Sequence, residues 1–202
     1  MSSNIDHIFY INLDYRTDRR EQIETELNNF GLSYERVSAI RFNPGLVGCG
    51  LSHIKVLRLA KERGYKNILI LEDDFTFLVS KETFEEQLRL FFDSKIDYDI
   101  CMLSYNLYRG MNIGHPSVQK VLEAQTTSGY IVNSHYYDIL IHTFETAMKQ
   151  YQTTHPYHQT HSIDQFWKPL QPVGNWYYFK TRIGKQRASY SDISEVFIDV
   201  GC

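Results

Sequence analysis

Cysteine is scarce in this chain of 202 residues. The three thiols, Cys49, Cys101 and Cys202, are odd in number and lack the spacing of a metal site. This argues against a disulfide framework and for a reducing compartment. Long apolar runs are also missing: no stretch approaches transmembrane length, and residues 1–6 are too polar to start a signal peptide. We therefore expect a cytoplasmic protein without a transmembrane segment, with peripheral contact at a membrane left open.

A strong excess of either charge is missing as well. The formal net charge is −3, which gives no general affinity for nucleic acid. Internal repeats and low-complexity tracts are absent. What the chain does have is 43% hydrophobic and 22% charged residues, which is typical of a globular protein. The length suits one domain, so we expect residues 1–202 to form a single domain.

The most informative stretch is NILILEDD, residues 67–74, where four apolar residues run into the acids Glu72, Asp73 and Asp74. A short β-branched-rich run is typical of a strand buried on both faces. Three adjacent carboxylates repel one another, and a divalent cation with a phosphate-bearing ligand would explain their proximity. Ligands bind past the carboxyl ends of strands in open α/β sheets. The alternative is a solvated acidic turn that begins a helix.

Helices and strands alternate in the first half of the chain, which predicts an α/β fold with a mostly parallel sheet. The expected strands are residues 7–13, 34–40, 67–72, 98–104, 121–124, 129–132 and 176–180. The expected helices are residues 18–30, with a capping box of Asp18 and Glu21, and residues 51–63, 80–92, 134–151 and 162–167. Gly45, Gly48 and Gly50 predict a flexible segment before the second helix, and residues 106–119 and 181–202 read mostly as loop.

Basic residues gather after the first expected strand, in YINLDYRTDRRE. Guanidinium groups bind phosphate or carboxylate in a two-point fashion, which favours Arg16 and, less strongly, Arg19 or Arg20. Asn12 beside them can read a base or ribose edge. The alternative is that these arginines are solvated positions on the first turn of a helix.

The segment GCGLSH places Ser52 and His53 in the expected first turn of a helix, where free N–H groups favour an anion. His53 as a partly buried helix residue is the alternative. His155, His158 and His161 recur every three residues, but their polar surroundings favour an exposed loop over a metal site.

Two late segments carry further candidates. Asp164, in HSIDQFW, is an acid among apolar residues and can serve as a general base or as the N-cap of a short helix. Arg182, Lys185, Gln186 and Arg187 gather around a glycine, as in a lid over a diphosphate or in a basic surface loop.

Taken together and in order, YINLDYRTDRR, GCGLSH, LILEDD, HSIDQFW and QRASYSDI resemble glycosyltransferase family 25, over roughly residues 5–195. The resemblance implies a GT-A-like fold with a Rossmann-type, mostly parallel central sheet flanked by helices. It also implies a nucleotide-sugar donor, Mn²⁺ or Mg²⁺ dependence and inversion at the anomeric carbon. The acidic stretch takes the part of the family's Asp-x-Asp motif, although its first acid here is Glu.

The resemblance also implies roles for single residues. Asp74 is the best metal ligand, with Glu72 beside it, and Asp164 falls where an acid that activates the acceptor is expected. The third metal ligand stays open between Asp192 and water. The expected donor-binding residues are Asn12, Leu13, Arg16, Ser52, His53, Asp73, Arg182 and Gln186.

The resulting hypothesis is a metal-dependent inverting transferase that moves a hexose, with galactose as the expected sugar, from a UDP-sugar to an acceptor. The acceptor would be a saccharide or a hydroxylated peptide or lipid-linked molecule, in glycan or lipopolysaccharide biosynthesis. Residues 5–110 would bind the nucleotide sugar and residues 111–202 would serve the acceptor side. The alternatives are an inactive nucleotide-sugar-binding module, a structural partner of a larger enzyme, and a metal-dependent phosphatase or hydrolase.

Overall fold

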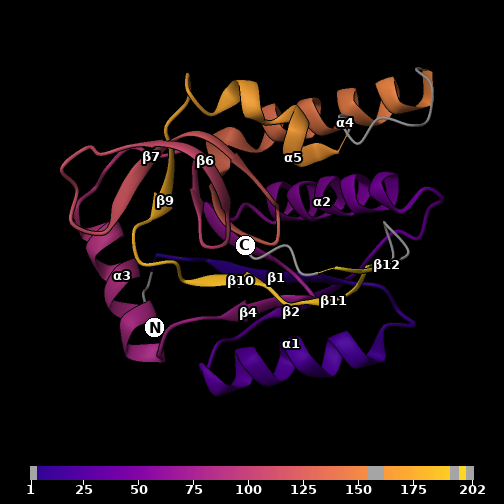
Figure 1. Cartoon of the computed structure of the whole chain (residues 1–202), viewed down its shortest axis with the longest axis horizontal. Coiled ribbons are helices and arrows are strands. Elements are labelled where there is room, and N and C mark those ends of the chain that lie inside the picture. The colour runs from indigo at the N-terminus through magenta and orange to yellow at the C-terminus, as the bar shows by residue number, and fades with distance from the viewer. Residues whose placement is uncertain (1–3, 154–161, 192–195, 199–202) are drawn as a thin grey trace.

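The computed structural model describes residues 4–153, 162–191 and 196–198 (Figure 1). Its helices are α1 Thr17–Asn29, α2 Gly45–Glu62, α3 Lys81–Asp93, α4 Tyr137–Thr153, α5 Ile163–Phe166 and the short 3₁₀ turns η1 Ser134–Tyr136 and η3 Lys168–Leu170. Its strands are β1 His7–Asn12, β2 Glu35–Ser38, β3 Asn67–Glu72, β4 Phe75–Phe77, β5 Ile100–Met102, β6 Asn106–Met111, β7 Val118–Gln125, β8 Gly129–Asn133, β9 Trp176–Phe179, β10 Gly184–Gln186, β11 Ser189–Ser191 and β12 Val196–Ile198.

One eight-stranded sheet organises the fold, in the order β2-β1-β3-β8-β5-β9-β7-β6. β1 pairs in parallel with β2 and β3, and β5 pairs in parallel with β9, whereas β8 and β7 run against their neighbours. Six of the eight strands therefore point the same way. The expected α/β fold with a Rossmann-type, mostly parallel sheet flanked by helices is confirmed.

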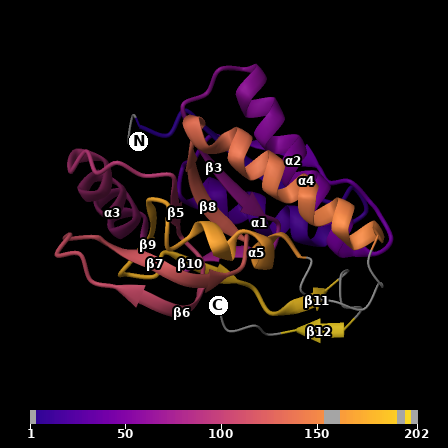
Figure 2. The same ribbon diagram turned by 90° about the horizontal axis from the view of Figure 1, so that it is seen from above.

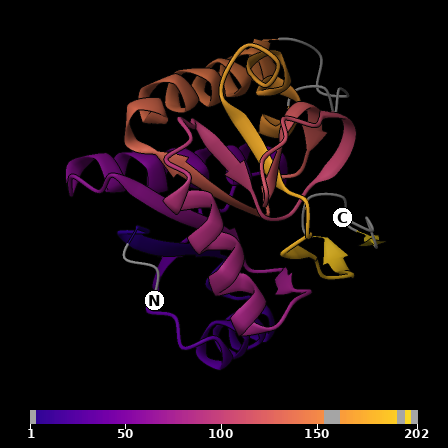
Figure 3. The same ribbon diagram turned by 90° about the vertical axis from the view of Figure 1, so that its left-hand side faces the viewer.

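Helices cover both faces of this sheet, with α2 and α4 on one side and α1 on the other (Figures 1 and 3). The view from above shows α2 and α4 side by side (Figure 2). Alternate residues of β3 face opposite ways: Ile68 and Ile70 pack with α2 and α4, and Leu69 and Leu71 pack with α1 and α3. All four side chains are fully buried. A strand buried on both faces must be apolar throughout, which is why β3 reads as a continuous apolar run.

The helix ends follow the sequence signals only in part. Ser80 caps α3 by accepting a hydrogen bond from the Thr83 amide, as expected. The capping box at Asp18 is wrong, because α1 begins one residue earlier, at Thr17, and has no side-chain cap. The Asp18 carboxylate instead accepts hydrogen bonds from the Arg16 guanidinium.

The prediction of a flexible glycine segment before the second helix is also wrong, because α2 already begins at Gly45. Two of these glycines allow close packing. A Cβ on Gly48 would collide with the backbone of residue 40, and one on Gly50 would lie 2.7 Å from the Met148 sulfur of α4. Close packing, and not flexibility, explains Gly48 and Gly50.

Two segments expected to be loops contain strands. Residues 106–119 hold β6 and the start of β7, which form an antiparallel pair at the sheet edge. Most of β6 is exposed, so its sequence lacks the apolar alternation that identifies a strand. Residues 181–202 hold β10, which pairs with β4, and β11, which pairs with β12. No helix in the described ranges is both long and apolar enough to span a membrane.

Candidate active site

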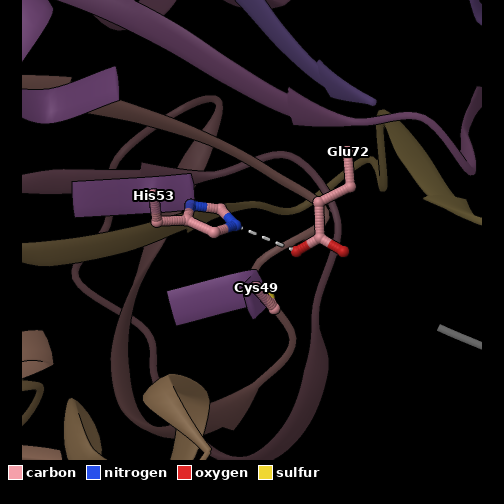
Figure 4. A group of neighbouring side chains, drawn as sticks. All are labelled: Cys49, His53 and Glu72. Carbon is pink, nitrogen blue, oxygen red and sulfur yellow. Dashed lines mark hydrogen bonds and ion pairs between the residues drawn. The ribbon is translucent and has the colours of Figure 1, made fainter. Parts of the chain in front are cut away.

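The three acids at the end of β3 diverge to different partners. Glu72 is the last residue of the strand and turns toward α2. Its Oε1 accepts a hydrogen bond of 2.6 Å from the Thr127 hydroxyl and lies 3.2 Å from His53 Nε2. Figure 4 shows the His53 ring directed at this carboxylate. These contacts outweigh burial, so the pKa of Glu72 lies below its usual value.

Asp73 is held by two donors on the other side of the strand. Its Oδ2 accepts a hydrogen bond of 2.8 Å from the Asn12 amide, and its Oδ1 accepts one of 2.9 Å from Arg19 Nη1. Burial still raises the pKa of this carboxyl. Asn12 also donates to the Arg16 carbonyl and accepts from Arg36, so its amide is occupied in shaping this end of the sheet.

Asp74 is the least satisfied acid of the three. Its Oδ2 accepts hydrogen bonds from Arg19 Nη1 at 3.2 Å and from Gln186 Nε2 at 3.1 Å. Its Oδ1 is buried and has no hydrogen-bond partner among the residues that the structure describes. Burial, with repulsion from Glu72 and Asp73, raises the pKa of Asp74 to about 7.

A cavity of about 150 Å³ lies beside Glu72. Its walls come from the start of α2, the end of β3, the turn between β7 and β8, the start of α5, and β10. They are formed by Leu46, Cys49, Glu72, Thr126, Thr127, Ser162, Ile163, Asp164 and Gln186. Segments far apart in the sequence therefore meet around one small space. They bring together the carboxylates of Glu72 and Asp164, the turn residues Thr126 and Thr127, and Gln186, which donates to Asp74.

Asp164 is fixed in this cavity by two donors. Its Oδ2 accepts a hydrogen bond of 3.2 Å from the Thr126 amide, and its Oδ1 accepts one from the Ser162 hydroxyl. Of the two alternatives for Asp164, the N-cap is wrong, because Ser162 occupies that position of α5. Thr126 has a positive φ of 77°, which a β-branched residue rarely adopts, so the turn that holds Asp164 is strained.

Other expected donor-binding residues lie elsewhere. Ser52 and His53 are buried within α2 and not in its first turn, so the argument from free N–H groups is wrong for them. The Ser52 hydroxyl donates to the Gly48 carbonyl and accepts from the Ile40 amide, both within the fold. Arg182 donates to the Tyr105 carbonyl and lies over the Tyr105 ring.

Arg16 and Leu13 lie in the turn after β1, where the Arg16 amide donates to the Leu13 carbonyl.

The segment that includes Gln186 and Arg187 is tied to the acids, since the Arg187 amide donates to the Asp74 carbonyl at 2.6 Å. It is paired with β4, which corrects the prediction of a free lid or surface loop. The three spaced histidines and Asp192 lie outside the described residues.

The sequence pattern favoured Arg16 over Arg19, yet Arg19 is the residue that contacts Asp73 and Asp74. The pattern also did not single out Cys49, which lines the cavity, or Thr127, which donates to Glu72. Arg19 is 9% exposed and precedes Ile23 and Leu27 at four-residue spacing on the buried face of α1. That spacing was the available signal. The placement of Thr127 depends on the turn between β7 and β8 and had no sequence signal.

The arrangement fits a hard divalent cation at one position. Arg19 neutralises part of the charge of Asp73 and Asp74, and both Asp73 oxygens already accept hydrogen bonds. Asp74 Oδ1 remains a buried oxygen without a donor among the described residues, and carboxylate oxygens are the ligands that Mn²⁺ and Mg²⁺ prefer. Asp74 is therefore the residue that would hold such an ion.

Comparison with known proteins identifies related sequences. The sequence model of the family described as "Glycosyltransferase family 25 (LPS biosynthesis protein)" matches residues 41–166, which include the acids of β3 and Asp164. Two proteins called "Glycosyltransferase 25 family member" are similar. The one from Drosophila pseudoobscura pseudoobscura is 33% identical over 36% of this chain, and the one from Drosophila melanogaster is 30% identical over 37%. The matched part spans only 16% and 17% of those relatives.

A solved structure supports the fold. The crystal structure of a glycosyltransferase involved in the glycosylation of the major capsid of PBCV-1 matches with a TM-score of 0.50. The match covers 94% of this chain and 95% of that one at 11% identity, which is evidence of a shared fold alone. Because the family match extends over more than half of the sequence, the chain belongs to glycosyltransferase family 25.

Proposed function

We propose that this chain transfers a hexose from a UDP-sugar to an acceptor hydroxyl group, with inversion at the anomeric carbon. The proposed hexose is galactose, and the acceptor is a saccharide or a hydroxylated peptide or lipid-linked molecule. Family membership supports glycosyl transfer. The observation that carries the proposal is the buried Asp74 oxygen, which has no donor in the described part of the chain. Gln186, which donates to the other Asp74 oxygen, lines the same cavity as Asp164. The cytoplasmic location and the division into donor and acceptor parts near residue 110 belong to the same proposal.

The donor side would lie at the end of β3. A Mn²⁺ or Mg²⁺ ion held by Asp74 would supply positive charge to the diphosphate leaving group. Gln186 positions Asp74 through its 3.1 Å hydrogen bond, and Arg19 holds Asp73 and Asp74 in one orientation. Arg16, in the turn after β1, would add a second cation for the departing diphosphate.

The acceptor side would depend on Asp164. The Ser162 hydroxyl and the Thr126 amide fix both oxygens of its carboxylate at the cavity wall. In this position Asp164 would accept the proton of an acceptor hydroxyl while that oxygen attacks the anomeric carbon from the face opposite UDP.

The first test is calorimetric titration of UDP with and without Mn²⁺. Wild-type protein should bind UDP more tightly with Mn²⁺, and Asp74→Ala should lose that gain while remaining folded. Asp93→Ala is the matched control, because Asp93 is an exposed acid on α3 that pairs only with Arg89 among the described residues. Unchanged Mn²⁺-dependent affinity in Asp74→Ala would refute the metal assignment.

The second test separates binding from transfer. Asp164→Asn should bind UDP as the wild type does but lose transfer to a panel of saccharides and hydroxylated peptides, by roughly 10²–10⁴-fold if Asp164 is the base. Near-normal turnover would remove Asp164 from that role. Release of UDP from UDP-galactose without any acceptor would favour an enzyme, whereas binding without turnover in the wild type would favour an inactive binding module.

A further inference from the structure

A thiol, an imidazole and a carboxylate meet beside the cavity. Ligand atoms of Cys49, His53 and Glu72 all lie within 4.8 Å of one another (Figure 4). We propose that these three residues form a binding site for a borderline divalent cation, Zn²⁺, distinct from the hard cation expected at Asp74. The assignment removes Glu72 from the Mn²⁺ ligands and leaves Asp74 as the carboxylate for that ion.

The local structure fixes the three donors. Cys49 and His53 are four residues apart in α2 and therefore project from the same face of the helix. Glu72 approaches from the end of β3, which packs against that face. His53 is fully buried, so its ring cannot turn to solvent. Two ligands four residues apart on one helix face occur in known zinc sites, where a third residue completes the protein ligands.

The residues around the cluster orient it as the second shell of a metal site would. The Tyr130 hydroxyl lies 2.9 Å from His53 Nδ1, and the Thr127 hydroxyl donates to Glu72 Oε1 at 2.6 Å. When His53 Nδ1–H donates to Tyr130, the lone pair of Nε2 is directed at Glu72, where a cation would lie. Metal-bound histidines are commonly fixed through their other nitrogen in this way.

The donor set selects the ion. A thiolate with an imidazole suits Zn²⁺, whereas Mn²⁺ and Mg²⁺ prefer oxygen ligands. Three protein ligands leave a fourth tetrahedral position open. Cys49 and Glu72 both line the cavity, so the fourth ligand would come from there, as water or as a hydroxyl of a bound molecule. Binding would release the Cys49 proton.

The ordinary alternative is that the 3.2 Å contact between His53 and Glu72 is a buried polar pair that only supports the fold. That alternative needs no thiol. It predicts that the wild-type chain binds no metal ion through the Cys49 thiolate, which makes the two explanations separable by experiment.

The test is titration of the metal-free chain with Co²⁺, a spectroscopic substitute for Zn²⁺. The wild type should show one equivalent of tetrahedral Co²⁺ with an intense thiolate-to-metal charge-transfer band, and Zn²⁺ should displace it. Cys49→Ser should lose the band. Cys101→Ser is the matched control and should keep it, since Cys101 is buried on the opposite face of the sheet, with α1 and α3.

A second variant guards against misfolding of the first. Tyr130→Phe should keep the band but weaken Zn²⁺ affinity by about 10- to 100-fold, as loss of a second-shell hydrogen bond does. A wild-type protein that gives no charge-transfer band, or a band that survives in Cys49→Ser, would overturn the proposal. The spectra need neither UDP nor a sugar, so the result is independent of the Mn²⁺-dependent UDP titration.

Discussion

Replacing Asp74 with asparagine tests the electrostatics of the acidic cluster most directly. The substitution keeps the shape of the side chain and an oxygen that can accept from Arg19 and Gln186. It removes the negative charge of a residue that is 6% exposed and lies beside two other acids. We expect it to abolish Mn²⁺ binding. We also expect the metal-free variant to be more stable than the metal-free wild type, by a margin that is larger at neutral pH than in acid.

The size of the effect follows from the pKa. Burial and the neighbouring acids raise the pKa of Asp74 from 3.8 to about 7. Between these pH values the native state holds a proton that the unfolded state has released, so wild-type stability falls as the pH rises. Each unit corresponds to about 1.4 kcal/mol, so the whole window corresponds to about 4 kcal/mol. An asparagine side chain does not titrate, so the variant gains by that amount relative to wild type, and the difference is constant above neutral pH.

The assay is urea unfolding at a series of pH values, followed by the fluorescence of Trp167 and Trp176, which are both fully buried. The free energy of unfolding of the variant minus that of the wild type should widen from about pH 4 to about pH 7 and then level off. In a second arm at neutral pH, Mn²⁺ should raise the Tm of the wild type by mass action and leave the variant unchanged.

Asp93→Asn is the matched control, because Asp93 is an exposed acid on α3 and should give no such widening. Parallel pH profiles for wild type and Asp74→Asn would contradict the reasoning, since they would mean that Asp74 is already ionised in the native state at low pH. An equal Mn²⁺-induced rise of the Tm in both proteins would separately contradict the metal assignment.

Three further predictions concern residues around the site. Arg19→Met leaves buried carboxylates without their cation and should cost roughly 3–5 kcal/mol, visible as a Tm lowered by about 10 °C in a circular dichroism melt; an unchanged Tm would contradict the role of Arg19. Gly184→Ala would press a Cβ into the Phe75 ring and should cost about 1–3 kcal/mol in urea unfolding, which a neutral result would refute. Ser52→Ala should lower stability by about 1–3 kcal/mol with UDP affinity unchanged in calorimetry, and weakened UDP binding would restore Ser52 as a donor-binding residue.

Local pattern was enough to place the acids. The run Ile68–Leu71 predicted a strand buried on both faces, and the charges that begin at Glu72 predicted its end; β3 confirms both. The helix α3 with its Ser80 cap and the alternation of strands and helices followed from the same kind of local signal. The edge strand β6 did not, because an exposed strand carries no apolar alternation.

The sequence by itself determined that three carboxylates stand at the end of a central strand, because strand burial and alternation are properties of neighbouring residues. Only the tertiary structure decided their partners. Glu72 meets His53 because α2 packs on one face of the sheet, and Asp74 meets Arg19 and Gln186 because α1 and β10 pack near the other. Such contacts join residues that are 19 to 112 positions apart, and no local spacing encodes them.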